Sequence, residues 1–287
     1  MQAYAVYGRE NPVRDKLSEA ELKAVDPAEL TTKFAELPIY EHDIVYYGPE
    51  KAQTVLKDLQ EVMPFPKETL KFPEEKKFKE TVPSENMVYV FDYPSSQTQV
   101  LLLRADTPFS LDKLAFASLF QPYAGRTVMR DIREKRGLAY TATAFYSLPE
   151  KKDKLSYAAG YVGTQGDKLP EALRELKALM EKIPDSPNQF HSAREKVLQG
   201  IRSDRIQREG IYTLFRRAGK RGLHHDWRKN IYEDASAMTL QDFNAFHQKH
   251  VAGKNDSILL IGDLKQIDRK ALESFGKIKI LTLNEIF

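Results

Sequence analysis

Residues 129 to 146 read Met-Arg-Asp-Ile-Arg-Glu-Lys-Arg-Gly-Leu-Ala-Tyr-Thr-Ala-Thr-Ala-Phe-Tyr and join a helix pattern to a strand pattern. The first half is charged and typical of the last turns of a helix, which we expect to end at Gly137. The second half alternates small or polar residues with apolar ones, which is the period of a strand. A helix that ends at a glycine and continues into a strand brings Arg133 and Tyr140 near one junction.

Arg133 and Tyr140 are therefore the candidate site residues of this stretch. A guanidinium and a phenol both donate hydrogen bonds, and together they could stabilise one carbonyl or oxyanion. The alternative is that the basic run is a solvated helix end, where the helix dipole favours lysine and arginine. Spacing alone favours the solvated helix end.

The composition is that of a globular chain. Of 287 residues, 41% are hydrophobic and 30% are charged, which argues against both disorder and a membrane-spanning protein. The 44 basic and 41 acidic residues are interleaved and leave a net charge of +3, so a nucleic-acid surface is not indicated. The absence of cysteine excludes disulfides, thiolate metal sites and a cysteine nucleophile.

The common catalytic motifs are also missing from the sequence. None of the six histidines stands in H-E-x-x-H or H-x-x-E-H spacing. His247 and His250 are three apart and could share a metal on one helix, but the sequence fixes no further ligand, and solvated or capping histidines are the simpler interpretation. No G-x-S-x-G or phosphate-binding glycine motif occurs. We therefore predict no metal or cofactor site in this chain.

We expect an α+β fold with a mostly antiparallel sheet and helices packed on one face. Around the junction, Leu111 to Tyr123 has a helical pattern that Pro122 and Gly125 should interrupt, and a second helix should carry Arg126 to Arg136. Later in the chain, Ser186-Pro-Asn-Gln189 has the spacing of a capping box that opens another helix. Strands are expected over 87–92, 98–105, 139–147, 155–162 and 257–261.

The alternation along 140–146 predicts one buried and one accessible face for that strand. We interpret Ala142, Ala144 and Tyr146 as candidate substrate-binding residues beside Tyr140. An extended peptide could pair with this strand by strand addition.

An internal repeat organises the rest of the chain. The order helix, strand, glycine turn, helix and phenylalanine occurs over 29–65, with its strand at 39–47, and again over 240–275. Residues 64–83 are rich in proline and charge and read as an exposed linker. We expect residues 1–75 to be the C-terminal part of a preceding homologous α/β domain plus linker, so that the first copy is truncated. Residues 76–287 should form the complete domain.

The stretch Arg130-Asp-Ile-Arg-Glu-Lys-Arg-Gly-Leu-Ala-Tyr-Thr resembles the pitrilysin (insulinase-like) family of zinc metallopeptidases. The repeat and the terminal segment 281–287 resemble that family too. The resemblance implies paired α/β domains in two halves around a chamber, with an inverted H-x-x-E-H zinc site in the N-terminal half. The C-terminal half offers an arginine and a tyrosine seven apart, which fall on Arg133 and Tyr140. The segment Pro122–Arg126 departs from the glycine-rich segment of the family.

The resemblance implies the C-terminal, non-zinc half of a zinc-dependent endopeptidase. Zinc would belong to the parent protein or partner half, the substrate would be a peptide, and this chain alone would be inactive. The resemblance also favours a periplasmic or other extracytoplasmic compartment. The composition, in turn, predicts no nucleic-acid partner and no membrane span. One alternative is a catalytically inactive homologue that acts as a scaffold or peptide-binding subunit. Another is an unrelated α+β binding domain, for which the repeat would be accidental.

Overall fold

The computed structural model describes residues 1–63 and 66–287. Pro64 and Phe65, which belong to the predicted linker and repeat, lie outside the described residues. Among the helices of the described ranges, none is long and apolar enough to cross a membrane.

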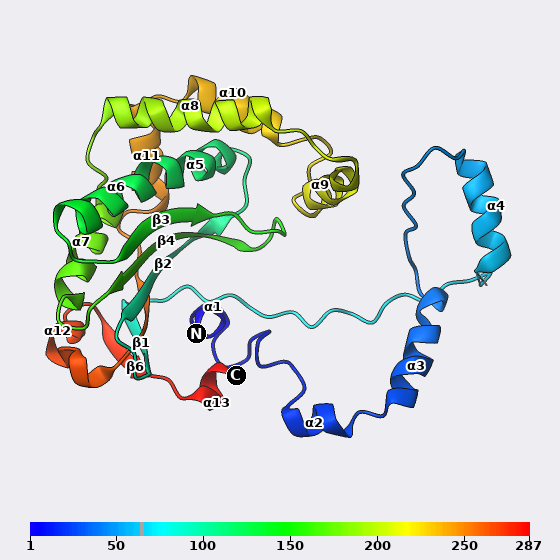
Figure 1. The fold of residues 1–287 in the computed structure, drawn as a ribbon, viewed down its shortest axis with the longest axis horizontal. Helices are drawn as coiled ribbons and strands as arrows, with labels where there is room; N and C mark the ends of the chain where they lie inside the picture. The colour runs from blue at the N-terminus through cyan, green and yellow to red at the C-terminus, as the bar shows by residue number, and fades with distance from the viewer. Residues whose placement is uncertain (64–65) are drawn as a thin grey trace.

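A mixed six-stranded sheet forms the centre of the fold, with the strand order β3-β4-β2-β5-β1-β6 (Figure 1). The strands are β1 (Met87–Asp92), β2 (Thr98–Pro108), β3 (Thr141–Ser147), β4 (Leu155–Thr164), β5 (Ser257–Gly262) and β6 (Lys277–Ile280). The pairings β2–β4, β2–β5 and β3–β4 are antiparallel, whereas β1 runs parallel to both β5 and β6. The predicted α+β class is confirmed, and the edge strand β6 was not predicted because only four residues carry its pattern.

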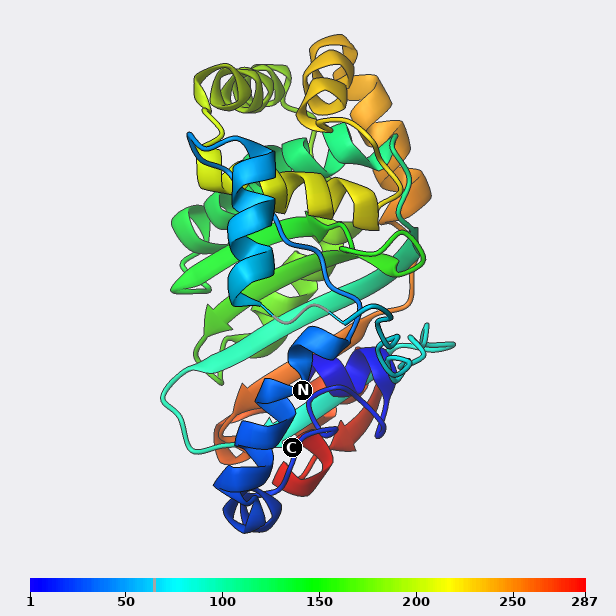
Figure 2. The ribbon, with the colours of Figure 1, turned by 90° about the vertical axis from the view of Figure 1, so that its right-hand side faces the viewer.

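Most helices of the domain cover one face of this sheet, as Figures 1 and 2 show from two sides. The α-helices of the domain are α5 (Lys113–Phe120), α6 (Arg126–Val128), α7 (Leu169–Glu181), α8 (Pro187–Ser203), α9 (Arg208–Lys220), α10 (Arg228–Ala237), α11 (Leu240–His250), α12 (Arg269–Glu273) and α13 (Leu283–Ile286). The N-terminal region adds α1 (Gln2–Tyr7), α2 (Glu19–Ala24), α3 (Pro27–Ala35) and α4 (Ala52–Val62). The short 3₁₀ turns are η1 (Leu37–Ile39) and η4 (Leu264–Gln266), and the π-helical segments are η2 (Gln121–Gly125) and η3 (Met129–Lys135).

A single core fills the space between the sheet and its helices. It joins apolar residues of β1, β2, β3, β4 and β5 to those of α5, α7, α8 and α11. A second, small cluster lies on the opposite face of the sheet, where Ala5 of α1 packs with Leu103, Ala159 and Leu259. The sheet is therefore thickly covered on one face and thinly on the other.

A buried arginine ties two helices to the sheet. Arg104 of β2 is fully buried, and its Nε donates to Asp256 at 2.6 Å. Its Nη2 donates to Glu181 at 2.6 Å, while Nη1 donates to the carbonyls of Met180 and Val251 at 3.1 Å each. Because a buried guanidinium is tolerated only when its donors are satisfied, this network holds the ends of α7 and α11 against β2.

The helix before the junction is continuous from Lys113 to Lys135, so the predicted interruption at Pro122 and Gly125 is wrong. Proline lacks an amide hydrogen, and its ring clashes with the carbonyl four residues earlier in an α-helix. The wider π turn η2, which contains Pro122, carries the chain through this position without ending the helix.

The region that precedes the domain is hardly packed. None of the described residues from 12 to 87 is buried, and α3 and α4 extend away from the sheet (Figure 1). The predicted strand over 39–47 is wrong, because only Tyr40 forms an isolated bridge, to Leu70. A strand needs a partner for its backbone groups, and the described chain offers this segment no other. The division into residues 1–75 and 76–287 stays a prediction.

His247 and His250 are buried rather than solvated, which corrects the expectation for these two residues. His247 stacks on Phe120 with ring centroids 6.1 Å apart, and Nδ1 of His250 lies 2.8 Å from Asp106. Burial, together with the nearby charge of Arg104, lowers the pKa of His247 to about 4. These histidines therefore belong to the core of the domain.

The aromatic centre of the core gives a first prediction. Phe243 is fully buried, with its ring centroid 4.7 Å from that of Phe116 and 5.2 Å from that of Tyr123. Phe243→Ala should lower the free energy of unfolding by roughly 3–5 kcal/mol because it removes apolar contacts and leaves a cavity. Urea denaturation measures this loss. The control Phe215→Ala, on a side chain that is 65% exposed, should change it little, and equal losses would refute this packing.

The burial of His247 gives a second prediction, on pH dependence. The folded state keeps this imidazole neutral, whereas in the unfolded chain it binds a proton near pH 6.5. Stability should therefore fall as the pH drops from 6.5 toward 4, by roughly 1–3 kcal/mol from this group. His247→Leu should flatten the pH profile of the urea midpoint over that range, and the exposed-site control His224→Leu should keep the wild-type slope. An unchanged slope in His247→Leu would contradict the assignment.

Candidate functional site

The junction between the helix and β3 is a tight backbone corner, and the predicted helix end at Gly137 is confirmed. Gly137 has a φ of 62°, a left-handed conformation that favours glycine. Its amide donates to the carbonyl of Arg133 at 3.1 Å, and the amide of Leu138 donates to that of Ile132 at 3.0 Å. These bonds close the π-helical end of η3 and turn the chain directly into β3.

Both side chains predicted at this corner are accessible. Arg133 is exposed, and its guanidinium has no hydrogen bond or ion pair within residues 1–63 and 66–287. Tyr140 is 51% exposed, and its hydroxyl accepts a hydrogen bond from Gln165 at 3.1 Å. The Tyr140 amide donates to the carbonyl of Gly163 at 2.8 Å, which holds this residue against β4. A guanidinium and a phenol are thus free to meet a ligand from solvent.

The side chains of Ala142, Ala144 and Tyr146 lie on the buried face of β3, so their prediction as an accessible substrate face is wrong. They point toward the helical layer, while Thr141 before them is exposed and Thr143 between them is half-buried. The predicted alternation of buried and accessible residues along this strand is confirmed, but Ala142, Ala144 and Tyr146 lie on the buried face and not on the accessible one. Peptide pairing through the backbone of β3 stays a prediction.

The helix crosses β3 at a position that only glycine can occupy without a shift. A Cβ added to Gly125 would lie 2.5 Å from the carbonyl oxygen of Ala144 and 3.3 Å from its amide nitrogen. Backbone thus packs directly on backbone here, which explains why small residues stand on both sides of the contact.

Tyr146 takes part in a buried ionic cluster instead of a binding face. Its hydroxyl donates to Asp106 at 2.5 Å, and Lys113 and His250 lie 3.0 and 2.8 Å from the same carboxylate oxygen. Burial on its own would raise the pKa of Asp106, but the hydrogen bonds from Tyr146, Lys113 and His250 outweigh it and lower that pKa. Burial and the Asp106 carboxylate raise the pKa of Tyr146. This cluster is a structural tie between β2, β3, α5 and α11.

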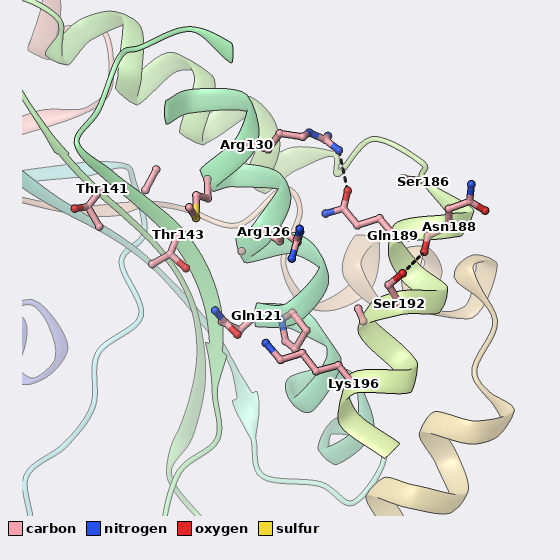
Figure 3. Close-up of a pocket in the computed structure, with 15 residues that line it drawn as sticks. Gln121, Arg126, Arg130, Thr141, Thr143, Ser186, Asn188, Gln189, Ser192 and Lys196 are labelled. Carbon is pink, nitrogen blue, oxygen red and sulfur yellow. Dashed lines mark hydrogen bonds between the residues drawn. The ribbon is translucent and has the colours of Figure 1, made fainter. Parts of the chain in front are cut away.

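A groove of about 930 Å³ opens beside the outer edge of β3 (Figure 3). One wall is the helical stretch from η2 to η3, the second is the first part of α8, and the third is β3 with Thr141 and Thr143. Its lining contains the cations Arg126, Arg130 and Lys196 and several amides and hydroxyls, but no carboxylate. The groove therefore favours an anionic ligand.

Gln189 holds two walls of the groove together. Its Nε2 donates to the Thr127 hydroxyl at 2.9 Å and to the Tyr123 carbonyl at 3.2 Å, and its Oε1 accepts from Arg130 at 2.8 Å. Arg130 also donates twice to Asp131, at 2.8 and 3.3 Å, which neutralises part of its charge. The predicted capping role of Gln189 is thus wrong, because its side chain is used between helices.

Arg126 and Lys196 are the cations of the groove that remain available. Both are exposed, and neither has an ion pair or side-chain hydrogen bond in the described part of the chain. The Lys196 side chain extends from α8 toward the helix that carries Arg126 (Figure 3). The sequence carried one signal for the helical wall of the groove, which is the one-turn spacing of Arg126 and Arg130. Nothing local indicated Lys196, and the predicted pair at the corner does not line the groove.

The described residues offer no set of ligands that fits a zinc ion. Within the described ranges no group of three or more histidine, cysteine, aspartate or glutamate side chains could hold a metal. Zinc in proteins needs at least three such ligands. The cation-lined groove is likewise unsuited to a metal.

Comparisons with known proteins agree with this architecture at the level of fold. No protein-family model matches the sequence, and no curated protein matches it. Solved structures do match. A peptidase M16 inactive domain from Pseudomonas fluorescens gives a TM-score of 0.58 at 17% identity over 74% of this chain. The periplasmic protease PqqL from Escherichia coli gives 0.61 at 13% identity over 75%, and pitrilysin gives 0.62 at 12% identity over 94%.

This chain spans only part of each of those proteins. The matches cover 50% of the M16 inactive-domain structure, 24% of PqqL and 30% of pitrilysin. Identities this low establish a common fold, and function has to be argued from the site. The chain therefore has the fold of M16 peptidase structures such as pitrilysin.

Proposed function

We propose that this chain is the C-terminal, non-zinc half of a zinc-dependent endopeptidase and contributes substrate-binding groups to a shared active site. The observation that carries the proposal is the corner itself. In a fold shared with M16 peptidases, Arg133 and Tyr140 flank a helix-to-strand turn and are both exposed. The sequence lacks H-x-x-E-H, which agrees with a supporting rather than a metal-bearing half.

Arg133 would act on the substrate backbone near the scissile bond. Its free guanidinium can donate charge-assisted hydrogen bonds to a carbonyl, and these strengthen as that oxygen becomes negative in the transition state. Tyr140 would add a neutral donor at the same oxygen. Its hydroxyl accepts a hydrogen bond from Gln165, so the hydroxyl proton is available for the substrate. Both groups bind and orient. Neither removes a proton in this proposal.

The metal and the attacking water would come from the homologous half, in the same polypeptide or in a partner subunit. The described residues of this chain do not fit zinc, so no step through the metal is assigned to them. The exposed apolar side chains of the N-terminal region support a missing neighbour, with Phe34 at 76% and Val62 at 76% exposure as extreme examples. Surfaces of this kind mark contact sites. We propose that residues 1–75 complete a preceding homologous domain.

A catalytically silent scaffold or peptide-binding subunit is the second candidate. It is favoured by the likeness to a structure described as a peptidase M16 inactive domain. On this alternative the corner would bind peptide without turnover. One of the similar structures is described as a periplasmic protease, which supports an extracytoplasmic compartment in either case.

The proposal predicts the effect of two substitutions in the protein that carries both halves. Arg133→Ala should lower kcat/KM for peptide hydrolysis on the order of 100-fold, because it removes a transition-state donor. Tyr140→Phe should lower it by a smaller factor, since a neutral donor is weaker. Steady-state hydrolysis of a quenched fluorescent peptide measures both. Arg174→Ala, on α7, is the control for lost charge and should keep wild-type activity.

The isolated chain should show no hydrolysis with added zinc. Unchanged turnover in both Arg133→Ala and Tyr140→Phe would refute their role. Absence of hydrolysis in the two-half protein itself would favour the scaffold.

A further inference from the structure

We propose that the groove between β3, α8 and the helix from η2 to η3 binds an extended acidic peptide segment. The segment would add as a strand to the free edge of β3 and direct carboxylates toward Arg126 and Lys196. This deepens the proposed function by naming the chemistry of the peptide, and it rests on that function only in taking a peptide as the ligand.

The sheet has an unpaired edge beside the groove. β3 ends the strand order and has β4 as its one strand partner in the described chain. Backbone groups on its outer side have no strand partner there and could pair with another strand wherever the helix leaves them open. Gly125 covers this edge at Ala144, so the accessible part is the beginning of the strand, where Thr141, Ala142 and Thr143 line the groove.

The groove is also positively charged. Arg126, Arg130 and Lys196 line the groove without any carboxylate among the lining residues. Asp131 already neutralises Arg130 in part, whereas Arg126 and Lys196 have no partner of their own in the described ranges. Elsewhere in the domain, buried charges are paired, as in Arg104 and its carboxylates. Unpaired cations on two facing walls are complementary to a ligand that brings anions between them.

The geometry of an added strand suits this arrangement. In a strand, alternate side chains point to the same side and repeat about every 6.8 Å. The helix that carries Arg126 lies between β3 and α8 (Figure 3), so one set of side chains would point toward Arg126 and, beyond it, toward Lys196. Acidic residues at every second position therefore match the groove better than a single acidic residue or a free anion. The hydroxyls of Thr141 and Thr143 flank the opposite side.

Direct binding to the intact chain tests the inference. The probe is a fluorescein-labelled octapeptide of alternating glutamate and threonine, followed by fluorescence anisotropy. It should bind, the lysine–threonine counterpart should not, and affinity should fall as salt is raised from low to physiological ionic strength. Arg126→Glu and Lys196→Glu should each weaken binding roughly tenfold, because each replaces attraction by repulsion.

A matched control separates the groove from general charge. Lys249→Glu makes the same charge change at an exposed position of α11 outside the groove and should leave affinity unchanged. A loss in this control equal to that in Arg126→Glu would overturn the site. Circular dichroism and urea unfolding confirm that each variant is folded.

A backbone-modified probe separates strand addition from simple ion pairing. The same acidic octapeptide with N-methyl groups on alternate amides cannot donate along one edge and should bind much more weakly. Equal affinity of the two peptides would overturn strand addition. Because these experiments read binding alone, their failure is distinguishable from a failure of the proposed peptidase role, which is read by hydrolysis and by Arg133 and Tyr140.

Discussion

Gly125 lies directly on the backbone of Ala144, so close that a Cβ would come within 2.5 Å of a carbonyl oxygen. This contact sets how far the helix from Lys113 to Lys135 stands from β3. A continuous helix at that distance has to pass Pro122, and the π segment η2 lets it do so. The helix ends at Gly137, where the chain turns into β3 and forms the corner. The same helix forms one wall of the groove.

Buried and exposed charges have different roles around this unit. Arg104 and Asp106 are buried, and each has partners on several elements, so that they fix α7 and α11 against the sheet. Such networks fix the positions of the elements that carry the partners, because an unpaired charge in the interior would be strongly destabilising. Arg126 and Arg133 are exposed on the same helix and have no carboxylate partner in the described chain. Cations kept free on a rigid element are suited to ligands.

The corner and the groove are two accessible surfaces of one rigid helix–strand unit. Arg133 and Tyr140 lie at the corner, while Arg126 and Lys196 face the groove beside the strand edge. In our proposals the corner meets the scissile region of a peptide, and the groove takes an extended acidic segment. The helix that runs into a strand belongs to the fold shared with M16 peptidase structures. In our proposal, a neighbouring homologous domain would cover the loosely packed N-terminal region.

Elements with local signals could be predicted from the amino-acid sequence. The strand periods at 87–92 and 257–261, the helix end at Gly137 and the α+β class needed only neighbouring residues. Tertiary structure decided the rest. Alternation along β3 cannot tell which face is covered, and Tyr146 is buried because Asp106, forty residues earlier, supplies its partner. The segment 39–47 has the composition of a strand, but in the described ranges it forms only the isolated bridge from Tyr40 to Leu70. Lys196 joins Arg126 only because α8 packs beside that helix.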